Sequence, residues 1–190
     1  MYFIQTLYID KNKDPFRDPF GWSAPEYHLM GWALSCLQLH NLYGNITLYA
    51  NSQGANLLID TLQLPYTEAF LTHDNLKMIH PDLWTLVKIY THSLQEQPFL
   101  HIDGDIFLFS PFDSKLLEGE LIAQNIETAT ENHYTRSQKE LMREFVFFPL
   151  CIQKDFESGL PVQACNTGIV GGNNLSFFRD YADWAFEVCS

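Results

Sequence analysis

The stretch Pro98 to Phe109 reads PFLHIDGDIFLF, and two carboxylates, Asp103 and Asp105, interrupt an apolar run that is typical of a buried strand. In an extended strand, residues i and i+2 lie on the same side with Cα atoms about 6.6 Å apart, so we expect both acids to face one ligand. Two neighbouring anions in apolar surroundings need a balancing charge. A divalent ion supplies it, because Mg²⁺, and Mn²⁺ by similar preference, takes one or two carboxylates together with phosphate oxygens and water.

The alternative is that the two acids begin a surface turn, since Asp-Gly is a common turn pair. Gly104 fits both interpretations, because it permits a turn and also permits the close approach of a bulky ligand. The apolar residues on both sides favour the strand.

The composition fits one globular domain over residues 1–190. Hydrophobic residues make up 46% of the chain, and 15 Phe, 9 Tyr and 4 Trp can fill a core. The net charge of -12 argues against nucleic acid as a partner, because binding to a phosphate backbone depends on surplus Lys and Arg. No run approaches the ~20 apolar residues of a membrane span, and the four cysteines lack CxxC spacing, so we predict reduced core thiols in a cytoplasmic protein.

Strand and helix signals alternate along the chain. Aromatic and β-branched residues predict strands at 2–9, 46–50, 66–71, 98–109, 120–126 and 162–170. Apolar periodicity predicts helices after a capping box at 23–26, at 55–62, 82–95 and 135–148, and after 172, the last with Phe177, Tyr181, Trp184, Ala185 and Val188 inward. This order predicts an α/β fold, a Rossmann-like three-layer unit with a mixed, mainly parallel sheet that binds ligands beyond the carboxyl ends of its strands.

Four further places have residues that can carry chemistry. Lys88 lies on the helix before the acidic stretch, where a solvated lysine is the alternative. Asn166 stands beside small residues and can meet a ligand, or it forms an Asx-turn at a strand end. His101 has its side chain on the same face as the acids, although a core histidine is the commoner case. The run Gly171-Gly172-Asn173-Asn174 is either a phosphate-binding nest or a bare turn before a helix.

Together these residues resemble the GT-A nucleotide-sugar glycosyltransferases, especially glycosyltransferase family 8, with its glycogenin-like and bacterial lipopolysaccharide enzymes. Asp103-Gly104-Asp105 is similar to the DxD that holds the metal against the donor diphosphate. Lys88 resembles the lysine that contacts the bound donor. Asn166-Thr167-Gly168-Ile169 resembles the Asn-Ser-Gly turn beside the donor sugar. Thr6 and Tyr8 match the first-strand segment that receives the nucleoside, and Asn51 occupies a similar place after the second strand.

The resemblance implies a single GT-A-like domain and a metal-dependent glycosyltransferase, with Mn²⁺ or Mg²⁺ held by Asp103 and Asp105. The donor would be a nucleotide-diphosphate sugar, a UDP-sugar by preference, and the acceptor a saccharide or glycoconjugate. The family's later metal-binding histidine has no counterpart before Ser190. The chain therefore lacks the C-terminal part of the full catalytic domain, is a divergent member, or uses a different third protein ligand.

Two other functions fit the same residues. One is a nucleotide-sugar-binding module without turnover. The other is a phosphatase of the haloacid dehalogenase type, in which Asp-x-Asp also ends an apolar strand but stands near the start of the domain and is followed by Thr or Val, whereas Ile106 follows here. No catalytic base is assigned, because Glu127 and Asp180 are the best acids and neither has a supporting pattern.

Overall fold

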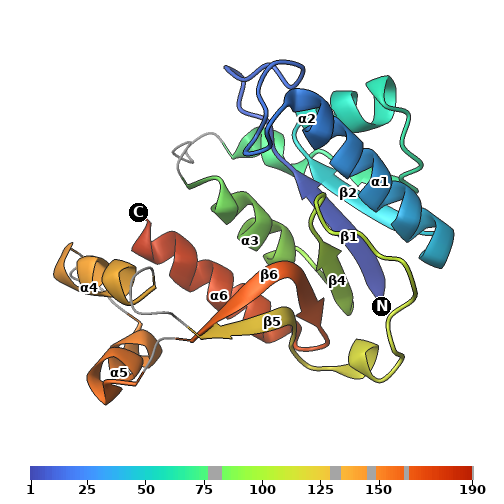
Figure 1. Cartoon of the computed structure of the whole chain (residues 1–190). Coiled ribbons are helices and arrows are strands. Elements are labelled where there is room, and N and C mark those ends of the chain that lie inside the picture. Colours follow the sequence, from blue (N-terminus) through green and yellow to red (C-terminus); the bar gives the residue numbers. More distant parts are fainter. Residues whose placement is uncertain (77–82, 129–133, 145–148, 161–162, 190) are drawn as a thin grey trace.

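The computed structural model describes residues 1–76, 83–128, 134–144, 149–160 and 163–189. These residues form a six-stranded sheet in the order β3-β2-β1-β4-β6-β5 (Figure 1). Strands β1 to β4 are parallel, and β6 runs antiparallel to both β4 and β5. The strand bounds are β1 Tyr2–Leu7, β2 Ile46–Ala50, β3 Glu68–Phe70, β4 Phe99–Ile102, β5 Ile122–Thr128 and β6 Gln163–Gly172. The predicted α/β architecture with a mixed, mainly parallel sheet is confirmed.

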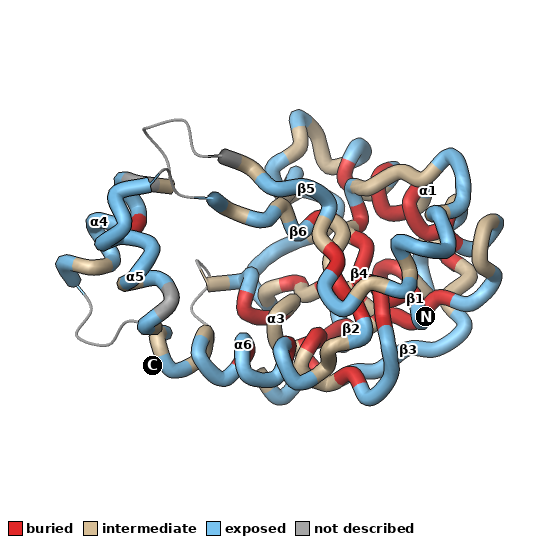
Figure 2. Tube along the Cα trace, turned by 90° about the horizontal axis from the view of Figure 1, so that it is seen from below, coloured by how far each residue is buried: buried red, intermediate tan, exposed pale blue. Residues whose placement is uncertain are grey.

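Helices cover both faces of the sheet. Figure 2 shows α1 on one side and α3 with α6 on the other, while α4 and α5 lie beyond the ends of β5 and β6, away from the sheet. The bounds are α1 Pro25–Tyr43, α2 Ser52–Ala55, a π-helical turn Asn56–Thr61, 3₁₀ turns Thr72–Asn75 and Leu116–Glu118, α3 Thr85–Ser93, α4 Tyr134–Glu144, α5 Leu150–Ser158 and α6 Leu175–Val188. The sheet is thus the middle of three layers, with α1 on one face and α3 and α6 on the other (Figure 2).

Alternation along the strands divides the core between the two faces. Phe3 of β1 and Leu100 of β4 belong to the larger apolar cluster on the side of α1. Their neighbours Ile4 and Phe99 point the other way and pack on Phe178 of α6. Each strand residue is therefore assigned to the α1 side or the α3–α6 side by its position, which also orients the polar residues described below.

The start of α1 differs from the prediction. Ala24 is the N-cap residue, and no side chain caps the helix, so the capping box expected at 23–26 is wrong. Pro25 occupies the first turn, where the missing N–H needs no partner.

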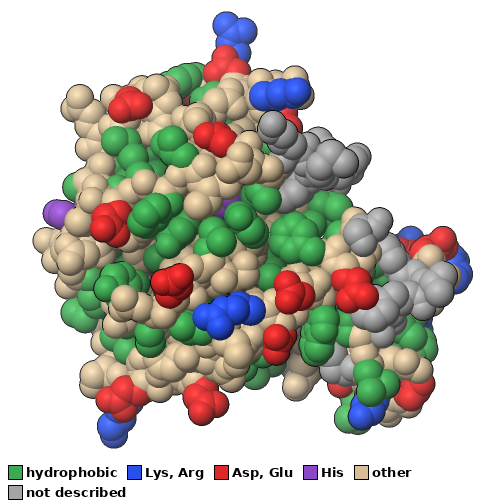
Figure 3. Space-filling view, turned by 180° about the vertical axis from the view of Figure 1, so that it is seen from behind, with side chains coloured by type: hydrophobic (Ala, Val, Ile, Leu, Met, Phe, Trp, Pro, Cys, Tyr) green, Lys and Arg blue, Asp and Glu red, His purple; other side chains and the backbone are tan. Residues whose placement is uncertain are grey.

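The buried face of α6 also differs from the prediction. Phe178 and Ala182 are buried, whereas Phe177, Tyr181 and Trp184 are 42 to 47% exposed. Two adjacent apolar stripes run along this helix, and only packing against the sheet decides which one is buried. Figure 3, seen from the α3–α6 side, shows apolar side chains at the surface between acidic ones.

The predicted helix 135–148 corresponds to α4 up to Glu144, and its last four residues lie outside the described residues. Among the described cysteines Cys36 is buried, but Cys165 and Cys189 are exposed, so the expectation of core thiols fails for these two. In the described part of the chain no helix combines the length and the apolar character needed to cross a membrane.

Candidate functional site

The two acids lie in a turn that follows β4. The strand ends at Ile102, and the Ile106 N–H donates to the Asp103 carbonyl oxygen at 3.1 Å, which closes a turn over residues 103–106. The predicted strand 98–109 is therefore wrong beyond Ile102, and the turn alternative describes the acids correctly. Asp103 is half-buried and Asp105 is exposed, so the two carboxylates do not share one strand face.

Helix α1 supports this turn from one side of the sheet. A Cβ on Gly104 would lie 2.4 Å from Cε2 of Trp32, so the close approach expected at Gly104 is made by an indole rather than by a ligand. The Ser35 hydroxyl donates to the Asp103 carbonyl oxygen at 3.2 Å, and the Gln5 side chain donates to Ser35 at 3.0 Å. These contacts fix the backbone of the turn.

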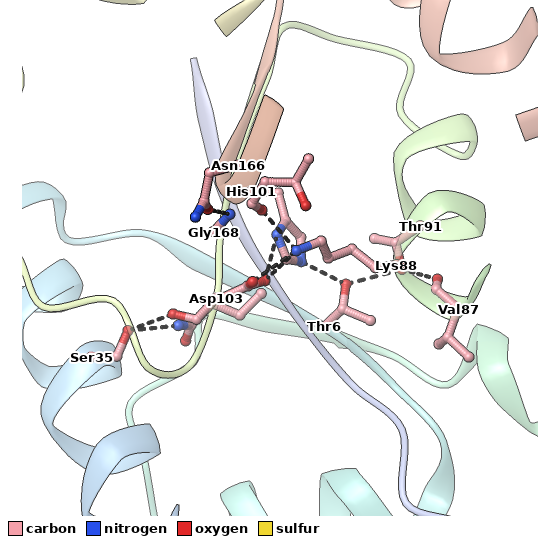
Figure 4. Close-up of polar contacts among 11 residues, drawn as sticks. Thr6, Ser35, Val87, Lys88, Thr91, His101, Asp103, Asn166 and Gly168 are labelled. Carbon is pink, nitrogen blue, oxygen red and sulfur yellow. Dashed lines mark hydrogen bonds and ion pairs between the residues drawn. The ribbon is translucent and has the colours of Figure 1, made fainter. Parts of the chain in front are cut away.

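Lys88 of α3 is the counter-ion of Asp103. Its Nζ lies 2.8 Å from Oδ1 and 2.7 Å from Oδ2 of Asp103, and it also donates to the Thr167 carbonyl oxygen at 2.7 Å (Figure 4). Only 18% of the Lys88 side chain is exposed. The solvated alternative for Lys88 is therefore wrong, and one ammonium joins α3, the acidic turn and β6.

A bulge in β6 makes the third of these contacts possible. Ala123 pairs with Val170 and Asn125 pairs with Asn166, so residues 167–169 of β6 face Gln124 alone. Extra residues of this kind bend a strand and release its backbone groups from the ladder. The Thr167 carbonyl is thereby free for Lys88, and the Gly168 carbonyl oxygen accepts from the Asp103 N–H at 2.8 Å.

Asn166 is held at the start of the bulge. Its side-chain oxygen accepts from the Gly168 N–H at 3.0 Å, which is the Asx-turn expected as the alternative, and its Nδ2 donates to Glu127 at 3.0 Å. Glu127 also accepts from the Tyr134 hydroxyl at 2.7 Å. Hydrogen bonds from Tyr134 and Asn166 lower the pKa of Glu127, so this carboxylate is held ionised as a structural acceptor. Asp180 is exposed on α6.

A buried chain of hydrogen bonds lies beneath the ion pair on the α3–α6 side. His73 Nε2, Thr91 Oγ1, Thr6 Oγ1 and His101 Nε2 follow one another at 3.0 Å each. Burial lowers the pKa of His73 to about 4 and that of His101 well below its usual range, with the positive charge of Lys88 acting in the same direction on His101. Thr6 is thus a predicted site residue that the structure joins to His101.

The sequence analysis missed His73, Thr91 and the neighbouring His92. Thr91 and His92 follow Lys88 by three and four residues, so a polar stripe on the buried side of one helix was the available signal. The His92 ring lies 5.0 Å from the His101 ring, and burial lowers the pKa of His92 to about 3.

Asp103 experiences opposing electrostatic effects. Burial raises its pKa, the charge of Lys88 and its hydrogen bonds lower it, and the nearby charge of Asp105 raises it again, with a net increase. A cation beside Asp103 therefore offsets the loss of hydration and the repulsion by Asp105 that disfavour the ionised carboxylate.

Two predicted site residues stand apart from this group. Asn51 binds backbone atoms with both ends of its amide, accepting from Ile9 N–H and Gly54 N–H and donating to the Ile9 carbonyl, so it caps α2 and fastens the end of β1. Tyr8 is half-buried just after β1. The Gly171-Gly172 pair ends β6, and a Cβ on either would lie 2.1 Å from a backbone oxygen, so close packing explains these glycines. Both glycines belong to the strand, and only Asn173 and Asn174 lie in the connection to α6, where their backbone N–H groups donate to the Glu120 carbonyl oxygen at 3.1 and 3.0 Å.

The acidic turn fits a hard divalent cation in part. Asp103 and Asp105 offer two carboxylates, the number that Mg²⁺ usually takes from protein beside phosphate oxygens. Among the described residues no three His, Cys, Asp or Glu side chains are grouped as a ready-made metal cage. A cation held here therefore takes part of its shell from a ligand, from water or from a rearranged side chain.

Comparison with known proteins gives one match. Residues 1–190, the whole sequence, match the model of a family of unknown function, DUF6734. No curated protein and no solved structure matches the chain. The chain with this acidic turn, its lysine and its bulged strand therefore belongs to the DUF6734 family.

Proposed function

We propose that the chain is a glycosyltransferase that holds a nucleotide-diphosphate sugar, by preference a UDP-sugar, at the carboxyl end of β4 and passes the sugar to a saccharide or glycoconjugate acceptor. The observation that carries the proposal is the position of Lys88. Its ammonium lies within 2.8 Å of Asp103 and of the Thr167 carbonyl. The three segments that resemble donor-binding motifs contain Lys88, Asp103 and Thr167, and they are far apart in the sequence. All three therefore come together at the Lys88 ammonium.

The strand order supports the same location. The order β3-β2-β1-β4 matches the first four strands of the doubly wound arrangement, in which the order of the strands reverses between the parallel neighbours β1 and β4. Ligands of such sheets bind in the crevice beyond the carboxyl ends of the strands at this switch point. Thr6, near the end of β1, and Asp103, just after β4, lie at the carboxyl ends of the two strands on either side of this switch point. A GT-A assignment is part of the proposal.

Each residue then has a distinct task. Asp103 and Asp105 hold the divalent cation, and Lys88 binds a phosphate oxygen of the donor. When bound, the ion supplies positive charge that stabilises the departing nucleoside diphosphate. Asn166 and Gly168 border the sugar at the bulge of residues 167–169, with Gln124 and Ile106 packed against Gly168.

The nucleotide-sugar-binding module without turnover is the second candidate, and one observation favours it. Glu127, one of the two acids considered as a base, is engaged by Asn166 and Tyr134, so it is not available as a base. A transfer assay with free UDP release as the readout separates the two functions. Donor binding without release, over a panel of saccharide acceptors, identifies the module.

A thermal-shift experiment tests the donor site. We expect UDP to stabilise the protein only when Mn²⁺ or Mg²⁺ is present, by about 2.7 kcal/mol at a concentration of 100 times its dissociation constant. Asp105→Asn removes an exposed carboxylate, so it is expected to abolish the metal dependence and to leave the protein folded. Equal stabilisation by UDP in chelator contradicts metal bridging, and an unfolded Asp105→Asn variant makes the acidic pair structural.

A further inference from the structure

One buried nitrogen beside the acidic turn has no hydrogen-bond partner among the described residues. This atom is Nδ1 of His101, and it lies 3.4 Å from Oδ1 of Asp103, with only 1% of the His101 side chain exposed. His101 stands two residues before Asp103, and its ring lies next to the ion pair that Asp103 forms with Lys88 (Figure 4). Burying a polar atom without a hydrogen-bond partner or another ligand costs free energy.

The hydrogen bonds around His101 decide which ring nitrogen carries the proton. The Thr91 hydroxyl donates to the Val87 carbonyl oxygen at 3.1 Å and accepts from the Thr6 hydroxyl at 3.0 Å. Thr6 has then used its only proton, so it accepts from the Nε2–H of His101, which lies 3.0 Å away. In the neutral ring Nδ1 is therefore a bare lone pair that faces the Asp103 carboxylate.

Two acceptors that face each other need a shared cation. In this structure Lys88 provides positive charge, with its Nζ 2.8 Å from Oδ1 of Asp103. The gap of 3.4 Å between Nδ1 and Oδ1 is also close to the spacing of neighbouring ligands on one ion, about 3 Å for bonds of about 2.1 Å at right angles. The Asp103 side chain is 30% exposed, so an ion can reach this pair from solvent.

The donor set also discriminates between metals. Imidazole nitrogen together with carboxylate oxygen suits first-row transition ions, whereas Mg²⁺ prefers oxygen ligands alone. Of the two ions that the acidic turn can hold, Mn²⁺ is the one that gains from a neighbouring imidazole.

We propose that Nδ1 of His101 is a protein ligand of Mn²⁺ beside the carboxylate of Asp103, that the exposed Asp105, which is not grouped with these two side chains in this structure, turns toward the ion, and that Lys88 leaves Asp103 for a donor phosphate when the ion enters. This rests on the proposed function, which supplies the donor phosphate and the metal. His101 is then the residue that makes the site select Mn²⁺ over Mg²⁺.

The test measures the metal directly, on the full chain without nucleotide. Loss of the EPR signal of free Mn²⁺ gives the affinity, with Mg²⁺ as competitor, and pulsed EPR of the bound ion detects coupling to a ligating imidazole nitrogen. The two variants are His101→Gln and His28→Gln. His28 is the matched control, because it is also buried, has a ring nitrogen without a hydrogen-bond partner among the described residues, and is electrostatically coupled to Asp105.

We expect nitrogen coupling in the wild type and in His28→Gln, and Mn²⁺ affinity above Mg²⁺ affinity. His101→Gln should lose the coupling and bind Mn²⁺ about tenfold more weakly or worse, since even outer partners of metal ligands have effects of that size. Bound Mn²⁺ without nitrogen coupling, or coupling lost in His28→Gln, overturns the role of His101 and leaves the donor site standing. No Mn²⁺ binding with or without UDP overturns both proposals.

If circular dichroism shows that His101→Gln does not fold, nitrogen NMR of the wild-type chain decides. The metal-free protein should contain a histidine with protonated Nε2 and bare Nδ1 whose signal broadens on addition of Mn²⁺. A protonated Nδ1 on His101 would make the ring a hydrogen-bond donor to Asp103 and overturn the inference.

Discussion

Lys88 is the residue on which both the ion pair with Asp103 and the proposed donor site depend. Lys88→Met removes the ammonium and keeps an apolar stem of similar length. We expect it to weaken nucleotide-sugar binding by about 1.5 to 3 kcal/mol, the range for a hydrogen bond with a charged group. Titration calorimetry at constant Mn²⁺ measures this, with Lys115→Met at an exposed lysine as the control. Equal affinity in wild type and Lys88→Met removes Lys88 from the site.

The same variant has a second expected effect. Asp103 loses its counter-ion, and the pair is intermediate between an exposed and a fully buried one, with 18% and 30% of the two side chains exposed. We therefore expect the free energy of unfolding to fall by about 1 to 3 kcal/mol. Urea denaturation of wild type, Lys88→Met and Lys115→Met measures it. A stability equal to that of wild type would mean that the ion pair does not persist in solution.

Gly104 tests the support of the acidic turn by α1. Gly104→Ala places a methyl group 2.4 Å from the Trp32 ring, and overpacking of this kind is expected to cost about 1 to 3 kcal/mol of stability. Replacing Trp32 with Leu should itself be destabilising but should reduce the added cost of Gly104→Ala, because the two residues are in contact. Chemical denaturation of the four members of this cycle gives the coupling. Independent, additive effects would show that the indole does not restrict the turn.

At the scale of the element, two of the three glycines of β6, Gly168 and Gly171, have different neighbours. A Cβ on Gly171 would lie 2.1 Å from the carbonyl oxygen of Phe99, whereas a Cβ on Gly168 would meet the side-chain ends of Gln124 and Ile106. A side-chain end can move, but the backbone of a paired strand has no such freedom. We expect Gly171→Ala to destabilise the protein by about 3 kcal/mol or more and Gly168→Ala by less than about 1.5 kcal/mol.

Thermal unfolding of both variants, followed by circular dichroism, measures this difference. Gly168→Ala is the matched control, because it makes the same chemical change on the same strand. Similar losses of stability at both positions would indicate that the bulge at 167–169 tolerates an added methyl group no better than the paired part of β4 and β6 does. The backbone around Thr167 would then be as rigid as the paired strands, although residues 167–169 lie outside the regular register.

For the whole molecule, the buried histidines set the response to acid. Burial lowers the pKa of His73 to about 4 and that of His92 to about 3, from an ordinary 6.5. Between pH 6.5 and about 4 the unfolded chain binds protons that the folded chain does not. The free energy of unfolding should therefore fall as the pH falls through this window, by up to about 2.7 kcal/mol per pH unit for two histidines.

Urea denaturation at a series of pH values within this window measures the slope. His73→Gln should reduce the slope by up to about 1.4 kcal/mol per pH unit, and His40→Gln, at an exposed histidine near the end of α1, is the control for the loss of a histidine. A slope that is the same in His73→Gln and wild type would show that His73 takes up its proton in the folded protein.

The sequence by itself determined the class of the fold and nominated Lys88 and Asp103, which the structure joins in one ion pair. Strands such as Ile46–Ala50 were predicted with their bounds, because β-branched and aromatic side chains between turn residues act locally. The alternation of such strands with periodic helices predicted a parallel sheet. Asp103 could be nominated from its place near the end of an apolar strand, and the resemblance to the GT-A glycosyltransferases added Lys88 and Asn166.

Only the tertiary structure decided how those residues are used. The acidic stretch leaves the strand at Asp103 because Trp32 and Ser35 of α1 hold a turn there. Asn51 caps α2 by accepting from the Gly54 N–H, and the rest of its amide is bound by the backbone of Ile9. These outcomes depend on contacts between residues distant in sequence, whose local patterns are equally compatible with either result. Local preference therefore fixes the elements, while the partner that each side chain meets across the sheet fixes its role.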